Sequence, residues 1–435
     1  MAQAMLIMPC LISMLSKSTC NKLTLWLTAM VLLHAFLAWR SLHAIGIGMP
    51  DFSSFYAAAV ILHDGHGYEL YDDRVQDAVQ RSFFPIGMQR RGSILPFYHP
   101  PFEALVFIPF ASLPYIGAYR VWFGINLILT IAALILLRRN FVILGGAPFY
   151  LWVLAGLGFY PLFIALMQGQ DSILIVLFYA MAFVAFRRGS ELREGACVGL
   201  GLCKCNLVLP FVFPLVLLRR KNFLAGFFSV SLLLALLGLA TVGWKGSLRY
   251  PTYVVAAEKN LGYAWISSVG HPANVRGIVE SLLPRVAPHL GFGLIAAVSV
   301  VLLASLTHAA RKAFLTSAVH PELVFALSLI ATALASYHCY VHDLSILFLA
   351  VLIVLEVLLS SNKFNGWSKR VLYCCIGILF CSPVYMLLTM RYKHSELIGV
   401  VLLLFFAVLF VEFIRIQPKV DAPAPVAEKS RIALT

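Results

Sequence analysis

The stretch GMPDFSSFYAAAVIL, residues 48–62, joins a long apolar run to a patterned one and places a single carboxylate, Asp51, at the junction. From residue 52 onward the apolar side chains recur three and four residues apart, which puts them on one face of a helix. This face consists of Phe52, Phe55, Tyr56, Ala59, Val60 and His63. We predict a helix lying along a membrane surface, with Asp51 as an N-cap that accepts a hydrogen bond from the amide of Ser53 or Ser54.

The composition around this stretch is that of a membrane protein. Hydrophobic residues make up 61% of the 435 residues and charged residues only 12%, and the mean hydropathy is +0.89. The formal charge of +14 does not indicate a nucleic-acid partner, because the Lys and Arg residues cluster at the ends of apolar runs, as the positive-inside rule requires. The nine cysteines form no spaced framework, so we expect no disulfides.

Ten apolar runs are candidates for membrane-spanning helices of roughly 20 residues. They are residues 23–41, 116–137, 147–166, 172–186, 223–243, 290–309, 321–337, 343–359, 371–389 and 396–414. Ten crossings leave both termini in the cytoplasm. We therefore predict a cytoplasmic or interfacial start (1–22), one transmembrane domain (23–415) and a disordered cytoplasmic tail (416–435).

Residues 194–218, EGACVGLGLCKCNLVLPFVFPLVLL, lie between two basic clusters that both indicate the cytoplasmic side. The segment should therefore enter the membrane and return as a broken hairpin, with Lys204 and Asn206 at its turn. Irregular backbone at membrane depth is tolerated only where protein or a water-filled cavity surrounds it. Lys204 is thus expected to face a cavity.

This topology places four polar patches on the outer side, namely 42–115, 166–172, 244–289 and 336–344. Within the first, residues 98–114 predict a second short helix, opened by Pro100 and Pro101 and closed before Pro114. The aromatic residues of the third patch, Trp244, Tyr250 and Trp265, are expected to form an interfacial belt outside any site.

Five successive blocks of the chain resemble glycosyltransferase family 87. They are DFSSFYAAAVILHDGHGYELYD (51–72), YHPPFEALVFIPFASLPYIGAYRVW (98–122), GQDSILIVLFYAMAFVAFRRG (169–189), LGLCKCNLVLPFVFPLVLLRRK (200–221) and YHCYVHDL (337–344). That family includes mannosyltransferases with a polyprenol-phosphate-mannose donor. The resemblance implies an all-α polytopic membrane protein of the GT-C glycosyltransferase fold, a cavity on the extracytoplasmic face and a catalytic aspartate in the first outer loop, which is Asp51 here.

Sugar transfer to a hydroxyl needs a base, and a carboxylate contributes typically ~10²–10⁴ in rate in that role. Asp51 would take the acceptor proton in an inverting displacement. The alternative is that Asp51 is only a helix cap. The expected function is transfer of a hexose, most plausibly mannose, from a polyprenyl-phosphate-linked donor to a lipid or glycan acceptor at the outer face of a bacterial inner membrane.

The remaining candidates are polar residues on the outer patches and at the hairpin turn. Gln168, Gln170 and Asp171 could bind sugar hydroxyls or phosphate, or could form a solvated turn. Lys204 and Asn206 lie at membrane depth, where a charge is costly and marks a functional path. The partner of Lys204 would be the donor phosphate, or alternatively Asp171 or Asp343.

His338 and His342 are placed four residues apart, on one helix face, with Asp343 adjacent. We expect donor or hydroxyl contacts from this group, although a structural cluster or a metal site would use the same spacing. Arg276 could grip a phosphate, and Tyr98 with His99 could line the cavity near Asp51. The resemblance implies no metal or other cofactor, because the donor carries a single phosphate.

The chain departs from the usual family pattern at Cys205, where relatives have proline after the lysine, and again around Cys339. These two departures could mean a sugar different from the mannose of the relatives. A rival reading is a transporter or flippase for a lipid-linked or polar solute. Transporters show inverted repeats and paired broken helices, and we find no repeat. A further rival is a non-catalytic, acceptor-binding member of the fold.

Overall fold

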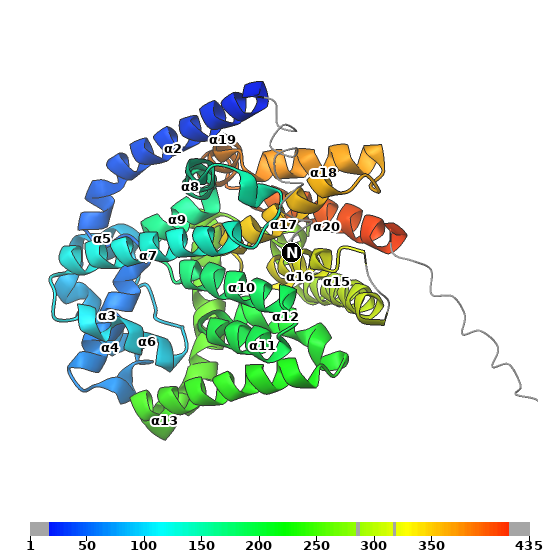
Figure 1. Cartoon of the computed structure of the whole chain (residues 1–435). Coiled ribbons are helices and arrows are strands. Elements are labelled where there is room, and N and C mark those ends of the chain that lie inside the picture. Colours follow the sequence, from blue (N-terminus) through cyan, green and yellow to red (C-terminus); the bar gives the residue numbers. More distant parts are fainter. Residues whose placement is uncertain (1–16, 284–287, 316–318, 417–435) are drawn as a thin grey trace, which may run out of the picture.

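The structure is a computed structural model that describes residues 17–283, 288–315 and 319–416, without the side chains of 17–19, 257–269 and 288. This part of the chain is mostly helical and contains no strand (Figure 1). The long helices are α2 (Lys17–Gly46), α7 (Tyr115–Arg138), α10 (Ser172–Arg187), α13 (Lys221–Val269), α15 (Pro288–Leu315), α16 (Glu322–Ala335), α17 (Leu347–Ser360), α18 (Gly366–Leu379) and α20 (Glu396–Ile416). The short α-helices are α3 (Phe52–His63), α4 (Asp73–Phe83), α5 (Pro85–Arg91), α6 (Pro101–Phe107), α8 (Phe149–Gly158), α9 (Tyr160–Gln168), α11 (Glu191–Leu200), α12 (Cys205–Leu217), α14 (Val275–Leu282) and α19 (Ser382–Met386). Single turns are η1 (Gly67–Glu69), η2 (Ile108–Phe110), η3 (Leu144–Gly146), η4 (Gly201–Lys204), η5 (Asp343–Ile346) and η6 (Leu387–Arg391).

The ten predicted apolar runs all fall on helices. Among the described residues, seven helices are long and apolar enough to cross a membrane, and two bent pairs raise the number to as many as nine. The pair α8 and α9 bends by 68°, and Gly366–Leu379 with Ser382–Arg391 bends by 64°. The predicted runs 172–186 and 321–337 became α10 and α16, of 16 and 14 residues. The all-α polytopic fold is confirmed.

The predicted hairpin is formed by α11, η4 and α12. A straight helix from Glu191 to Leu217 would be about 40 Å long, but Glu191 at its start forms an ion pair with Arg220 just beyond its end. The chain therefore enters and returns. The turn is at Lys204, whose φ of −114° and ψ of 74° depart from helical values. Residues 191–217 are thus re-entrant, although their length and hydropathy would suit a crossing.

The segment predicted to be the first outer loop packs differently from the prediction. Helix α3 does not lie on a surface, because nine of its twelve residues are buried, including Ala57 and Ala58 on the face predicted to be exposed. Its neighbours α4, α6 and η2 come from the same loop and cover it. The second predicted helix is confirmed, since α6 and η2 run from Pro101 to Phe110 and Pro114 precedes α7.

The predicted cap at Asp51 is wrong. The Asp51 carboxylate makes no capping hydrogen bond, and the amides of Ser53 and Ser54 donate instead to the backbone oxygens of Pro50 and Asp51. The carboxylate is bonded to Gln170 instead.

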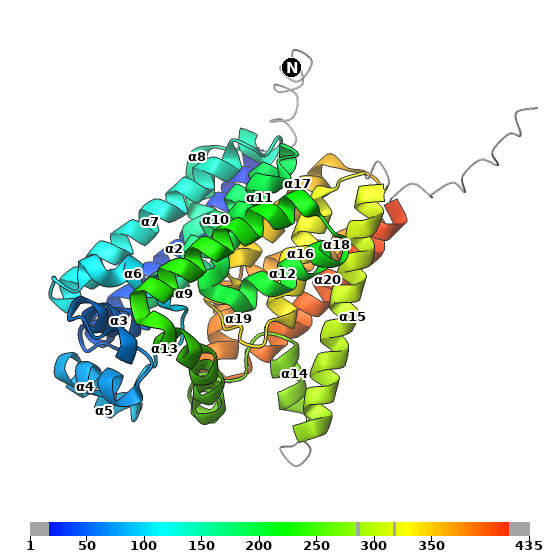
Figure 2. The ribbon, with the colours of Figure 1, turned by 90° about the horizontal axis from the view of Figure 1, so that it is seen from below.

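The third outer patch is mostly helical. Helix α13 continues past the predicted end at 243 to Val269, with a kink at Gly243 where φ is 68°. Figure 2 shows α3–α5, the second part of α13 and α14 gathered toward one end of the bundle.

The two predicted terminal segments lie largely outside the described residues. The predicted C-terminal tail begins where the description ends, at Ile416. Of the predicted N-terminal segment only residues 17–22 are described, as the first turns of α2.

Candidate functional site

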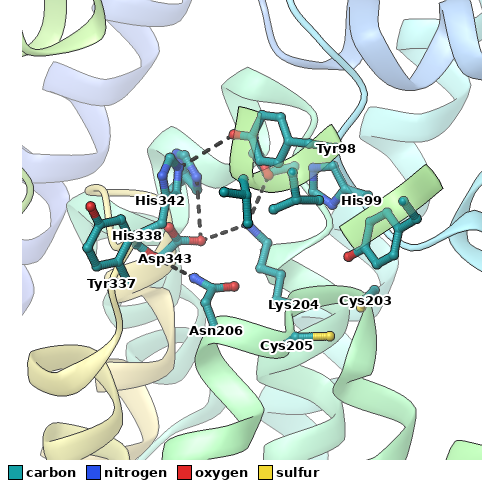
Figure 3. A pocket seen from close by; sticks show the side chains of 14 residues that line it. Tyr98, His99, Cys203, Lys204, Cys205, Asn206, Tyr337, His338, His342 and Asp343 are labelled. Carbon is teal, nitrogen blue, oxygen red and sulfur yellow. Dashed lines mark hydrogen bonds and ion pairs between the residues drawn. The ribbon is translucent and has the colours of Figure 1, made fainter. Parts of the chain in front are cut away.

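A cavity of about 420 Å³ lies where four distant segments meet. Its walls come from the loop before α6, the turn between α9 and α10, the hairpin turn η4, and residues 337–343 (Figure 3). Tyr250 of α13 also lines it, so the expectation that this tyrosine belongs only to an interfacial belt is wrong. Trp244 is exposed, as the belt predicts, and the Trp265 side chain lies outside the described part.

The turn between α9 and α10 connects the cavity to Asp51. Gly169 has a φ of 62°, and a Cβ there would lie 2.8 Å from the Cβ of Phe52, so the turn can pack against the start of α3 only with glycine. The Asp51 amide donates to Gln168 Oε1 at 3.1 Å. Gln170 Nε2 donates to Asp51 Oδ2 at 2.5 Å. Asp51 itself is not one of the residues that line the cavity, whereas Gln170, to which it is bonded, does line it.

The Lys204 ammonium contacts three side chains at the cavity. Its ammonium lies 2.7 Å from Asp343 Oδ1 and 3.2 Å from Asp171 Oδ1, and it donates to Gln170 Oε1 at 3.1 Å. Figure 3 shows this side chain pointing from the hairpin toward Asp343. Both carboxylates that we considered as alternatives to phosphate are thus its partners. One amide, that of Gln170, joins Lys204 to Asp51.

The segment of residues 336–342 is not helical, so His338 and His342 do not share a helix face. Its carbonyls are bonded to other segments instead: Asn206 donates to His338 O, and the Ala273 amide donates to Cys339 O at 3.1 Å. Both histidines nevertheless line the cavity. His342 Nε2 lies 3.4 Å from Asp343 Oδ1.

Tyr98 and His99 also line the cavity, as predicted. The hydroxyl of Tyr98 lies 3.5 Å from His338 Nε2. Arg276 is set back from the cavity: its guanidinium bonds Glu280 at 2.8 Å and lies 4.0 Å from the ring centroid of Tyr337, which is the residue that lines the wall.

Sequence reasoning missed Glu103. Its side chain is 2% exposed, and its Oε2 lies 3.0 Å from His99 Nδ1, which is 3.8 Å from Asp171 Oδ2. Burial, together with the charge of Asp171, raises the pKa of Glu103 well above its usual range. The signal was present, because Glu103 is the single charge in the otherwise apolar helix PFEALVF and follows His99 by four residues.

Arg91 was also missed. Its Nη1 donates to the Gly48 carbonyl, three residues before Asp51, while its Nε and Nη2 are buried and accepted by no described group. Nothing in the sequence MQRRG distinguishes it from a surface arginine.

An all-helical, multi-pass membrane protein that encloses carboxylates, amides and imidazoles in one cavity has a site for a polar substrate. Residues 97–336, more than half of the chain, match the model of glycosyltransferase family 87. The chain belongs to this family and is a membrane glycosyltransferase. No curated protein and no solved structure matches it. Asp51 and the segment from His338 to Asp343 lie outside the matched residues.

Proposed function

We propose that the protein transfers one hexose, mannose, from a polyprenyl-phosphate carrier to a hydroxyl of a lipid or glycan acceptor. The observation that supports this most is the single amide of Gln170, which holds Asp51 at one end and Lys204 at the other. A base for the acceptor and a cation for the leaving phosphate are thereby fixed relative to each other at the cavity. Such fixed placement of reacting groups is a major source of rate enhancement.

The step is an inverting single displacement. The acceptor oxygen attacks the anomeric carbon from the side opposite the phosphate, forming the new C–O bond as the bond to the phosphate oxygen breaks. Asp51 takes the hydroxyl proton, and the polyprenyl phosphate leaves with the bonding electrons. Phosphate is a good leaving group without protonation, so one carboxylate suffices.

Lys204 would attract the donor phosphate by exchanging part of its contact with Asp171 and Asp343 for contact with phosphate oxygens. Its burial strengthens that attraction, because charges interact more strongly away from water. His338, His342 and Asn206 would contact the sugar or the phosphate from the cavity wall, and Tyr98 would contribute a hydroxyl.

The sidedness of the reaction follows from charge. The site lies at the start of α10, and the basic pair Arg187 and Arg188 lies at its other end. Basic clusters mark the cytoplasmic side. We therefore place the cavity on the extracytoplasmic side of a bacterial inner membrane, where a lipid-linked sugar would be the available donor.

The test compares Asp51→Asn with a matched control, Asp64→Asn, at the exposed opposite end of α3. Membranes with each protein are incubated with radiolabelled polyprenyl-phosphate-mannose and lipid extract, and labelled lipid is resolved by chromatography. Asp51→Asn should lower transfer ~10²–10⁴-fold, and the control should transfer normally.

Equal transfer by wild type and Asp51→Asn would remove Asp51 from the base role. If the wild type transfers nothing from mannose, glucose or galactose donors on the same carrier, the proposed donor class is wrong. Unfolding temperatures of the two purified variants show whether a loss of transfer comes from a loss of fold.

A further inference from the structure

We propose that His99, Glu103 and Asp171 bind one divalent transition-metal ion in the wall of the cavity. Each residue offers one ligand atom, and the three atoms lie within 4.8 Å of one another. The three residues come from the loop before α6, from α6 itself and from the turn before α10. They meet only through the fold.

The spacing of the ligand atoms suits a metal ion. Metal–ligand bonds of about 2.1 Å at angles of 90–110° put neighbouring ligand atoms about 3.0–3.5 Å apart. His99 Nδ1 lies 3.0 Å from Glu103 Oε2 and 3.8 Å from Asp171 Oδ2. Small side-chain adjustments would bring all three atoms to bonding distance of one ion.

The two carboxyl groups otherwise lack donors. Glu103 is 2% exposed and Asp171 is 0% exposed, and no backbone amide or hydroxyl of the described residues donates to their four oxygens. The two carboxyl groups contact each other, and Lys204 Nζ lies 3.2 Å from Asp171 Oδ1. Their close neighbours are the His99 ring and, for Asp171, the Lys204 ammonium. Burying a carboxylate without donors is costly, and a cation would remove that cost.

The charge of the site points the same way. Three buried carboxyl groups, those of Glu103, Asp171 and Asp343, lie around one buried ammonium, that of Lys204, which pairs with Asp171 and Asp343. A donor phosphate would add a further negative charge to this wall. Protein ligands bind a metal ion in their deprotonated form, so a divalent ion would take the place of the proton on Glu103 and would balance Glu103 and Asp171, while Lys204 contacts the phosphate.

The ligand set indicates which ions would bind. One imidazole nitrogen with two carboxylate oxygens suits Zn²⁺ or Mn²⁺, whereas Ca²⁺ and Mg²⁺ prefer oxygen ligands alone. Because His99 lines the cavity, an open coordination position would face the donor phosphate. The role of the ion in transfer rests on the proposed function, and it departs from the metal independence that the family resemblance implies.

The experiment measures metal binding directly. Detergent-purified protein is stripped with EDTA, equilibrated with Zn²⁺ or Mn²⁺ and passed over a desalting column, after which bound metal is counted by mass spectrometry. Wild type should retain about one ion per chain, and its unfolding temperature should rise with the metal. Glu103→Gln and Asp171→Asn should retain less than a tenth as much.

A matched control uses an exposed pair of the same chemistry, His66 and Glu69, whose side-chain atoms lie 3.1 Å apart. Glu69→Gln should retain metal like the wild type. Gel filtration and the unfolding transition establish that each variant is folded, and His99→Gln provides a third variant if one carboxylate variant fails to fold.

Wild-type protein that retains no Zn²⁺ or Mn²⁺ would overturn the proposal, and a proton shared by the two carboxyls would then explain their burial. Equal retention by wild type and folded Glu103→Gln would overturn the assignment of ligands. Metal retention does not depend on the sugar or the acceptor, so a failure of the proposed transferase activity would leave this result standing.

Discussion

Buried acidic side chains in this protein differ in the hydrogen-bond donors that surround them. Glu356, near the end of α17, accepts hydrogen bonds from the amides of Val142, Ile143 and Leu144 at 2.7, 2.8 and 2.8 Å. These three donors hold the turn at η3 against α17. The group is satisfied by the fold alone, which is what a structural role requires.

Glu103 and Asp171 are buried at least as deeply, but no backbone amide or hydroxyl in the described part of the chain donates to them. Asp171 is paired with Lys204, which Asp343 shares, and Glu103 lies beside the His99 ring. The comparison teaches that burial alone does not distinguish a structural acid from a functional one. The supply of donors does, because an acid without donors is stable only if something else binds it.

The largest effect is expected for Lys204→Met. Removing one partner from a buried ion pair costs about 3–5 kcal/mol, and here Asp171 and Asp343 would both be left uncompensated, so transfer and the unfolding temperature should both collapse. The double variant Lys204→Met with Asp343→Asn leaves only Asp171 uncompensated, so it should regain part of the unfolding temperature without regaining transfer. Recovery of transfer as well would show that Lys204 only balances charge.

The next largest effect is expected for Glu356→Gln. The amide cannot accept all three backbone hydrogen bonds, and each bond to a charged group contributes about 1.5–3 kcal/mol. The unfolding temperature in detergent should fall clearly, while transfer per folded molecule stays at the wild-type value. A loss of transfer without a loss of stability would contradict the structural role of Glu356.

Glu103→Gln should leave stability almost unchanged, in contrast to Glu356→Gln. In protein stripped of metal, the raised pKa of Glu103 keeps its side chain neutral, so the substitution exchanges one neutral side chain for another of similar shape, and we expect a change in the free energy of unfolding of less than about 1 kcal/mol. Transfer should fall at the same time. If Glu103→Gln unfolds as early as Glu356→Gln, the contrast between the two acids is wrong.

The smallest effect is expected for Tyr98→Phe, which removes a hydroxyl 3.5 Å from His338 Nε2 but keeps the ring. A hydrogen bond of that length is weak. Transfer should change by less than about threefold and the unfolding temperature should not move. A loss as large as that of Asp51→Asn would contradict this minor contribution of the Tyr98 hydroxyl.

The sequence predicted the membrane helices and the returning hairpin because both follow from composition. Apolar runs must cross or enter the bilayer, and basic clusters on the same side of residues 194–218 require the chain to return. Lys204, Asp171 and Asp343 were identifiable for a related reason, since polar residues at the ends and breaks of such runs need partners. Their meeting was an inference from topology that the ion pairs confirm.

The errors have a common cause, which is that local patterns do not record what packs around them. Helix α3 has the pattern of a surface helix but is covered by α4 and α6. The spacing of His338 and His342 fits a helix, but this segment is not helical. Its carbonyl oxygens accept hydrogen bonds from Asn206 and Ala273, which are distant in the sequence.

The sequence by itself determined a polytopic membrane protein, because hydropathy and charge act residue by residue, and its successive sequence blocks indicated the family to which it belongs. Only the tertiary structure decided that the Asp51 carboxylate faces Gln170 and does not cap α3, and that Glu103 meets His99 and Asp171. Those contacts depend on which segments approach one another, and the side-chain direction and donor supply that result are properties of the packed chain.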